Sequence, residues 1–384
     1  MPHIPLKNRN FAVMTENILD KATAEQLRVL INRTRRAIIT CHISPDGDAM
    51  GSSLALCRVL RNAGKEVKVI TPDTPPRYLM FLPGADDIVV YSRFESFAKK
   101  ILADTELIFC LDYNDAKRVD HVAPALLESP AKKVMIDHHL NPDSFPDITI
   151  SHPEISSTCA LVYRVVTGCG FGRFIDRETA ECIYTGMMTD TGNFSYNSND
   201  PELYRIVARL LEKGIDKDAI YKKVYFNNSV NRLKLNGFAM NEKFEYFPSH
   251  RAALIKLTRS ELNEYHYQKG DTEDLVNRPL TCPDILYSVF LREETDYIKV
   301  STRSKGDFPV NKLCTEYFNG GGHLNAAGGE FYGTLEEAEQ QLMKAMPLYD
   351  RYLPDPCGDS PADNCPAEDC PAEGCSSEGC SSED

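Results

Sequence analysis

The chain has 384 residues, of which 42% are hydrophobic, 26% are charged and 9% are aromatic. These values are near the averages of globular proteins, so they exclude a collagen, a coiled coil and a wholly disordered chain, and the length allows two or three domains. The formal net charge is −13, but nine acidic residues and no Lys or Arg lie in 354–384, so the rest carries −4. That charge argues against the broad basic surface on which binding of long duplex DNA depends.

The sequence has no apolar run near the ~18 residues of a membrane-spanning helix, and its first residues lack the apolar core of a signal peptide. We therefore expect a cytoplasmic protein without a membrane partner. The segment 353–384 repeats short units rich in Pro, Ser and acid and contains five cysteines. We expect it to be a disordered, acidic, Cys-rich tail, because such a composition cannot bury a core.

Strands and helices alternate in the first half of the chain. Helical spacing of apolar residues over 17–34 predicts a first helix, and a second is predicted over 51–62. Short apolar segments predict the strands, at 37–42, 66–70, 106–112 and 133–137. This alternation is typical of an α/β domain with a mostly parallel, doubly wound sheet.

The pattern changes after a helical, charge-rich stretch at about 200–240. The segments RAALIKL, DILYSVFLRE and DYIKVSTRS predict strands of a smaller domain with a mixed sheet, and a final helix is predicted over 335–345. The expected divisions are an N-terminal segment and first helix (1–35), a catalytic domain (36–225), a linker (226–242), a substrate-binding domain (243–352) and the tail (353–384).

Residues able to bind a metal ion follow the predicted strands of the first domain. The carboxyl ends of parallel strands meet at one edge of a sheet, so side chains that follow different strands can converge there. Two histidines and four aspartates lie at such positions: His42, Asp46, Asp48, Asp112, His138 and Asp190. We place the first three in a loop between a strand and a helix.

This ligand set is large enough for two metal ions if one carboxylate bridges them. Imidazole and carboxylate ligands together suit Mn²⁺, and they also accept Mg²⁺ or Co²⁺. Paired metal ions promote hydrolysis of phosphate esters, which makes that the natural reaction. Each segment also has a plainer interpretation, since Asp46 and Asp48 are common in turns and Asp112 and Asp190 can cap helices.

A glycine cluster in the second domain is a candidate phosphate-binding segment. In NGGGHLNAAGG, the backbone of Gly320, Gly321 and Gly322 can approach a phosphate because glycine lacks a Cβ atom, although a simple loop is an equal alternative. His323 within it and Arg303 on a predicted strand add groups that bind anions. We therefore expect the second domain to hold the substrate.

Taken in order, these motifs resemble the DHH phosphoesterase family, named for the triplet that stands here as Asp137-His138-His139. The resemblance spans about 36–330 and includes HISPDGDAMGS, the strand-end Asp112, TDTG around Asp190 and the GGGHLNAAGG of a DHHA1 domain. It implies an N-terminal DHH domain and a smaller C-terminal DHHA1 domain, with the active site in the cleft between them. The length is similar to that of the nanoRNase/pAp phosphatase group.

The resemblance also implies a role for each site residue. One Mn²⁺ is expected on His42, Asp46 and Asp112, and a second on Asp48, Asp112, His138 and Asp190. Asp112, His138 and His139 are the implied catalytic residues, with Asp112 as the bridge and His139 beside the scissile phosphate. The implied substrate-binding residues are Arg303, Gly320, Gly321, Gly322 and His323. The chain departs from the family pattern at Tyr113-Asn114 and at Ala160, none of which is a metal ligand.

The implied activity is Mn²⁺-dependent hydrolysis of short oligonucleotides and of dinucleotides such as pApA and pGpG to mononucleotides, together with conversion of pAp to AMP. The expected partners are therefore short RNA or nucleotides, and the resemblance makes a homodimer plausible. Three alternatives stay open: a cyclic di-AMP phosphodiesterase, a pyrophosphatase or exopolyphosphatase, and a nucleotide-binding sensor without catalysis. The sensor predicts a lost metal ligand, whereas all six are present.

Overall fold

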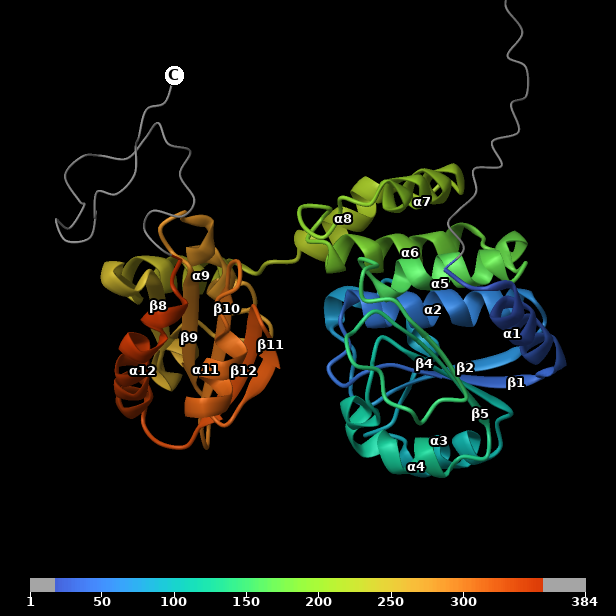
Figure 1. The fold of residues 1–384 in the computed structure, drawn as a ribbon, viewed down its shortest axis with the longest axis horizontal. Coiled ribbons are helices and arrows are strands. Elements are labelled where there is room, and N and C mark those ends of the chain that lie inside the picture. Colours follow the sequence, from blue (N-terminus) through green and yellow to red (C-terminus); the bar gives the residue numbers. More distant parts are fainter. Residues whose placement is uncertain (1–17, 355–384) are drawn as a thin grey trace, which may run out of the picture. The chain divides into compact units, whose positions relative to one another are not determined.

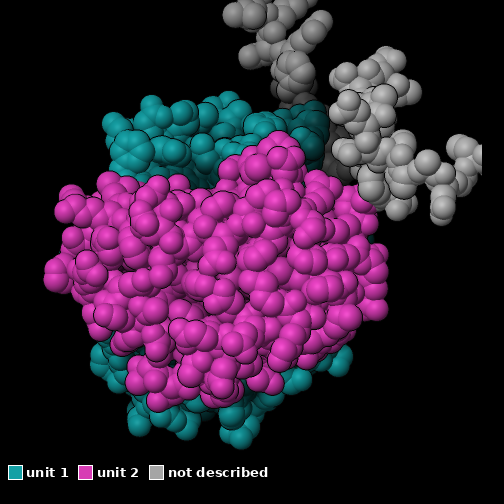
Figure 2. All heavy atoms as spheres, turned by 90° about the vertical axis from the view of Figure 1, so that its left-hand side faces the viewer, with its two compact units in different colours: residues 1–227 teal, residues 228–384 magenta. Residues whose placement is uncertain are grey.

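The computed structural model of the protein describes residues 18–354. These residues form two compact units (Figure 2). The first ends at Asn227 and the second begins at Asn228. The expected acidic tail lies outside the described residues, apart from its first two positions. Within the described part of the chain, no helix is long and apolar enough to cross a membrane.

The first unit contains a six-stranded parallel sheet with the order β3-β2-β1-β4-β5-β6 (Figure 1). Its strands are β1 (Arg36–Thr40), β2 (Glu66–Thr71), β3 (Val89–Val90), β4 (Leu107–Leu111), β5 (Lys132–Asp137) and β6 (Ile148–Ser151). Its helices are α1 (Lys21–Arg33), α2 (Gly47–Asn62), α3 (Glu95–Ala103), α4 (Ala123–Glu128), α5 (Thr158–Gly168), α6 (Arg177–Asp190), α7 (Pro201–Glu212) and α8 (Lys217–Tyr225).

Both faces of this sheet are buried, as strand β4 illustrates. Leu107, Phe109 and Leu111 enter one hydrophobic core, whereas Ile108 and Cys110 enter another on the opposite face. Helices α2, α5 and α6 cover the first face, and α3 and α4 cover the second (Figure 1). The doubly wound α/β fold expected from the alternating pattern is therefore confirmed.

The sheet topology fixes where a ligand can bind. The chain starts the sheet at β1, extends it to one side through β2 and β3, and then returns to place β4 on the other side of β1. The crevice beyond the carboxyl ends of β1 and β4 is the usual ligand site of such sheets. His42 lies two residues after β1, and Asp112 directly follows β4.

Helix α2 begins earlier than the sequence indicated. It starts at Gly47 rather than at about residue 51, because the Asp46 carboxylate accepts hydrogen bonds from the backbone N–H groups of Asp48 and Ala49 and so caps the helix. The expectation that Asp48 lies in a loop was wrong: it belongs to the first turn of α2. This places its side chain on a rigid element.

The second unit is a six-stranded mixed sheet with the order β11-β12-β10-β9-β8-β7, in which only β8 and β9 pair in parallel among the described strands. Its strands are β7 (Phe244–Phe247), β8 (Ala252–Leu257), β9 (Tyr287–Glu293), β10 (Ile298–Ser304), β11 (Gly321–His323) and β12 (Ala326–Phe331). Its helices are α9 (Val230–Glu242), α10 (Arg259–Glu264), α11 (Val310–Tyr317) and α12 (Leu335–Tyr349).

Two features of this unit differ from the sequence-based picture. The range 226–242, expected as a linker, contains helix α9, whose Leu235 and Ala239 pack in the same core as Ile255 of β8. The glycine cluster is not a simple loop but the hairpin of β11 and β12. The hairpin needs glycine at Gly320, because a Cβ atom there would lie 2.0 Å from the carbonyl oxygen of Gly328.

Glycine also permits the close packing of α2 on α6, which carries Asp190. A Cβ atom at Gly51 would lie 2.6 Å from the carbonyl oxygen of Cys182, and backbone cannot move aside cheaply. We expect Gly51→Ala to lower the free energy of unfolding by about 1–3 kcal/mol, the usual cost of overpacking a core.

The matched control for this substitution is Gly237→Ala in α9, where an added Cβ atom meets nothing within 4 Å. This change should be neutral or stabilise the protein by about 0.5–1 kcal/mol, because alanine is the better helix former. Urea unfolding of both variants measures the difference. Equal effects at the two positions would contradict the packing described for α2 and α6.

Candidate functional site

The six residues singled out as metal ligands come together at the carboxyl edge of the first sheet. Their ligand atoms form overlapping groups in which all atoms lie within 4.8 Å of one another. One group is His42, Asp46 and Asp112, and another is Asp48, His138 and Asp190. A third group joins Asp112 to His138 and His139, so Asp112 connects the two sides of the site.

Asp112 faces a different histidine with each of its carboxylate oxygens. Its Oδ2 atom lies 3.5 Å from Nε2 of His42, and its Oδ1 atom lies 3.6 Å from Nε2 of His138. The residue is 2% exposed, and its backbone is in the left-handed region with φ 63°. Such a conformation costs of order 1–3 kcal/mol for a residue other than glycine, and it is commonly retained at functional sites.

The two histidines are oriented by backbone carbonyl groups. Nδ1 of His42 lies 2.7 Å from the carbonyl oxygen of Ile43, and Nδ1 of His138 lies 3.1 Å from that of Ile155. A carbonyl oxygen only accepts, so Nδ1 carries a proton and Nε2 is the ring atom that faces the carboxylates. Metal-binding histidines in proteins typically have this second hydrogen bond.

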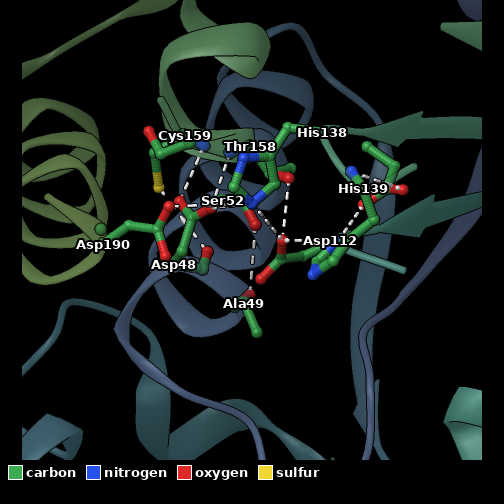
Figure 3. A network of polar contacts seen from close by, with 12 residues as sticks. Asp48, Ala49, Ser52, Asp112, His138, His139, Thr158, Cys159 and Asp190 are labelled. Atoms are coloured by element: carbon green, nitrogen blue, oxygen red, sulfur yellow. Dashed lines mark hydrogen bonds and ion pairs between the residues drawn. The ribbon is translucent and has the colours of Figure 1, made fainter. Parts of the chain in front are cut away.

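Asp48 is held by the first turn of helix α5. Its Oδ2 atom accepts a hydrogen bond of 2.6 Å from the backbone N–H of Thr158, and its Oδ1 atom accepts one of 2.8 Å from that of Cys159 (Figure 3). Ser157 caps this helix with its side chain. The positive end of the helix dipole thus faces a carboxylate that is only 1% exposed.

The carboxylates of the site repel one another. Burial raises the pKa of Asp48 well above its ordinary value, and the charges of Asp112 and Asp190 add to the effect. Burial likewise raises the pKa of Asp190 to about 7; the charge of His138 opposes this shift, and the charges of Asp112 and Asp46 add to it. The pKa of Asp112 shifts the other way: burial would raise it, but the hydrogen bond and charge of His42, together with the charges of His138 and His139, lower it.

A divalent cation fits this arrangement. Two buried carboxylates and two half-buried or exposed ones face imidazole Nε2 atoms. A bound cation would offset both the burial and the repulsion that raise the pKa values of Asp48 and Asp190. The donor set of oxygen and imidazole nitrogen suits Mn²⁺ and related ions. The six residues therefore form a site that can bind metal, as the sequence suggested.

His139 is oriented by the acid of its own triplet. Its Nδ1 atom lies 2.7 Å from Oδ1 of the fully buried Asp137, and its backbone N–H donates to Oδ2 of the same residue. Its Nδ1 atom is also 3.9 Å from Oδ1 of Asp112. Asp137 thus serves as the orienting partner of a histidine at the edge of the metal-binding group.

The predicted substrate-binding residues lie together in the second unit. Arg303 on β10 and His323 on β11 are both in register with Ala326 of β12, so the two side chains share one face of the sheet. They line a depression of about 670 Å³ together with Gly320 and Gly321, whereas Gly322, the fifth predicted residue, is not part of its lining. The grouping expected from the sequence is present as a surface, and its use by a substrate stays a prediction.

Family models match both units of the chain. Residues 36–187 match the model described as "DHH family, N-terminal domain", and residues 260–349 match the "DHHA1 domain". The chain is also 30% identical over 312 residues to a bifunctional oligoribonuclease and PAP phosphatase NrnA of Thermus thermophilus, covering 80% of this chain and 88% of that protein. The chain belongs to the DHH family.

Other DHH proteins resemble the chain over most of its length. The NrnA of Bacillus subtilis is 28% identical over 306 residues, with 79% of this chain and 92% of that protein covered. A cyclic-di-AMP phosphodiesterase GdpP of Geobacillus thermodenitrificans is 25% identical, but the match covers only 50% of that protein. A solved structure of an exopolyphosphatase-related protein from Bacteroides fragilis is 48% identical with a TM-score of 0.85, covering 87% of this chain and 98% of that chain.

The structure adds a site residue that the sequence did not reveal. The hydroxyl of Thr158 donates a hydrogen bond of 2.9 Å to Oδ1 of Asp112 (Figure 3). In the segment SSTCALVY, Ser and Thr before an apolar helix indicate only a helix start, and nothing in that pattern points to Asp112 forty-six positions earlier.

The stability of the metal-free protein should depend on pH. Because the pKa of Asp190 is raised from 3.8 to about 7 in the folded state, metal-free protein should lose stability as the pH rises through this interval. The raised pKa values of His42 and His138 act in the same direction above about pH 6.5. Mn²⁺ displaces these protons, so its stabilising effect should grow with pH.

Thermal unfolding with Mn²⁺ and with EDTA, at about pH 6 and pH 8, measures this effect. The gain in Tm on adding Mn²⁺ should be larger at the higher pH, and an Asp190→Asn variant should show a smaller pH dependence without metal. A gain that is constant or shrinks with pH would contradict the electrostatic description of the site.

A second prediction separates packing from binding in the glycine hairpin. A Cβ atom at Gly321 would meet nothing nearer than Oγ1 of Thr315 at 3.9 Å, so Gly321→Ala should keep the wild-type Tm. If a phosphate approaches this backbone, the same variant should raise KM for a nucleotide several-fold. Gly320→Ala should instead lower Tm, and a Gly321→Ala enzyme with unchanged KM would argue against binding at this surface.

Proposed function

We propose that the protein is a Mn²⁺-dependent enzyme that hydrolyses short oligonucleotides and dinucleotides such as pApA and pGpG to mononucleotides, and pAp to AMP. The chain is a phosphoesterase of the DHH family, and its homologues are named as oligoribonucleases and PAP phosphatases. The observation that carries the proposal is the position of Asp112, whose two oxygens face two separate sets of ligand atoms.

In this proposal the two sets of residues hold two divalent ions. One set is His42, Asp46 and Asp112, and the other is Asp48, Asp112, His138 and Asp190. Bound Mn²⁺ would supply Lewis-acid charge, which activates water and neutralises the oxygens of a phosphate ester. The chain's own contribution is to fix the ligands: carbonyl groups orient His42 and His138, and helix α5 orients Asp48.

His139 is proposed to act on the phosphate rather than on a metal ion. Asp137 holds its Nδ1 atom at 2.7 Å, which fixes the orientation of the ring. An imidazole can donate a hydrogen bond or a proton to the leaving oxygen of a phosphate ester. We expect His139→Asn to lower kcat while leaving Mn²⁺ binding near the wild-type level.

The depression on the second unit is proposed to hold the terminal phosphate of the substrate. Arg303 and His323 supply the positive charge and hydrogen-bond donors, and the glycines leave the backbone accessible. A site of this size accommodates a nucleotide rather than a long strand, and the chain as a whole is acidic. Short substrates fit both properties.

Two other substrates, a cyclic dinucleotide and polyphosphate, are included in the test because specific relatives favour them. The match to a cyclic-di-AMP phosphodiesterase favours a cyclic dinucleotide, although this chain spans half of that protein. The solved structure at 48% identity is described as exopolyphosphatase-related, which favours polyphosphate. The homologues matched over most of their length support the oligonucleotide instead.

Product analysis by chromatography tests the proposal. The protein is incubated with Mn²⁺ and, separately, with pApA, a 5-mer RNA, a 24-mer RNA, pAp, cyclic di-AMP, pyrophosphate and polyphosphate. We expect rapid release of mononucleotide from pApA and the 5-mer, and slow reaction of the 24-mer. Exclusive cleavage of cyclic di-AMP or of polyphosphate would replace the proposed function with the corresponding alternative.

The Asp112→Ala variant tests the bridging position directly. Because this change removes an oxygen from both ligand sets, kcat on pApA should fall by more than about 100-fold, beyond the loss typical of outer-shell residues. Asp86→Ala, at an exposed position of the same unit, is the control and should be fully active. Full activity of the Asp112 variant would disprove the two-metal assignment.

A further inference from the structure

The first turn of helix α5 contacts two of the proposed metal ligands, Asp48 and Asp112. A single residue, Thr158, contacts both. The backbone N–H of Thr158 donates to Oδ2 of Asp48 at 2.6 Å. Its side-chain hydroxyl donates to Oδ1 of Asp112 at 2.9 Å. Thr158 is fully buried, so neither contact competes with water.

The hydroxyl of Thr158 is not needed to start the helix. The preceding residue, Ser157, has the extended backbone of an N-cap, and its side chain accepts a hydrogen bond from the backbone N–H of Ala160. Capping is therefore complete without Thr158. The contact of its hydroxyl with Asp112 requires a different explanation.

The hydrogen bond from the Thr158 hydroxyl restricts the orientation of the Asp112 carboxylate. It reaches Oδ1, the oxygen that faces His138 at 3.6 Å, while Oδ2 faces His42 at 3.5 Å. A carboxylate on a single χ2 bond rotates readily, and χ2 of aspartate has only broad preferences. A buried donor fixed on one oxygen restricts that rotation and keeps one oxygen directed to each ligand set.

We infer that Thr158 is a positioning residue of the metal centre, which orients Asp112 through its hydroxyl and Asp48 through its backbone N–H. This inference rests on the proposed function, since it assumes that both carboxylates bind Mn²⁺. In this role Thr158 acts through the two aspartates that it contacts. It links the two ligand sets through the start of helix α5, so its hydroxyl affects the affinity of the pair of ions.

The test compares Mn²⁺ binding in full-length variants by isothermal titration calorimetry. Thr158→Val deletes the hydroxyl and keeps the shape and the backbone N–H, and it should raise the Kd for Mn²⁺ by roughly 10- to 100-fold, the usual effect of removing an outer-shell partner. Thr158→Ser restores a hydroxyl and should return Kd to within a few-fold of the wild type. In electron paramagnetic resonance at equal Mn²⁺, Thr158→Val should show less of the signal of exchange-coupled Mn²⁺ pairs.

Thr179→Val is the matched control for loss of stability. Thr179 is also fully buried, and its hydroxyl donates to Oδ1 of an aspartate, Asp176, that caps helix α6. This variant should lower Tm but leave the Kd for Mn²⁺ unchanged. Should Thr158→Val not fold, Thr158→Ala removes the same hydroxyl and carries the same expectation.

Wild-type affinity for Mn²⁺ in the Thr158→Val or Thr158→Ala variant would overturn the inference, as would a serine variant no better than valine. If Thr179→Val weakened Mn²⁺ binding equally, the effect would be one of general stability, and the inference would be overturned as well. If the wild type releases mononucleotides while Thr158→Val binds Mn²⁺ normally, the positioning role is wrong and the proposed function stands. Absence of saturable Mn²⁺ binding to the wild type would contradict both.

Discussion

Four carboxylates share a small volume at the edge of the first sheet, and their mutual repulsion is the constraint on which the site depends. Two of them, Asp48 and Asp112, are almost completely buried. Leaving such charges in a low-dielectric interior is costly unless positive charge and hydrogen bonds compensate them. The fold supplies part of this compensation through histidines, helix α5 and backbone N–H groups, and we propose that a divalent cation supplies the rest.

The parallel sheet makes this concentration of charge possible. Its order places β1 beside β4, so His42 and Asp112 emerge at the same crevice from segments about seventy residues apart. Helices α2 and α6 then bring Asp48 and Asp190 to that crevice, and the absence of a side chain at Gly51 lets them pack closely. Each candidate ligand thus stands on or next to a rigid element, which is what a preorganised metal site requires.

Much of this arrangement was predictable from the sequence because it follows from simple patterns. Apolar segments of strand length predicted β1, β2, β4 and β5, and the polar residues after them pointed to a common edge. Two short strands were missed. β3 has two residues and β6 has four, which is too few to show the alternation of apolar and polar residues that marks a strand. The early start of α2 was also missed, because Asp46 is equally common in a turn and as a helix cap.

Contacts that depend on tertiary packing were beyond the reach of sequence patterns. Nothing in the residues around Thr158 indicates that its hydroxyl meets Asp112, since that contact requires α5 to lie against the end of β4. The hairpin of β11 and β12 was hidden for a related reason: glycine-rich strands lack the alternation that marks a strand. In both cases the contact is made between elements, not within one.

The central claim is that Asp112 bridges two divalent ions, and anomalous scattering at the manganese absorption edge tests it most directly. In crystals grown with Mn²⁺, this account predicts two anomalous peaks roughly 3.5–4 Å apart on either side of the Asp112 carboxylate, one beside His42 and one beside His138. A single peak, or two peaks that do not share Asp112, would contradict it.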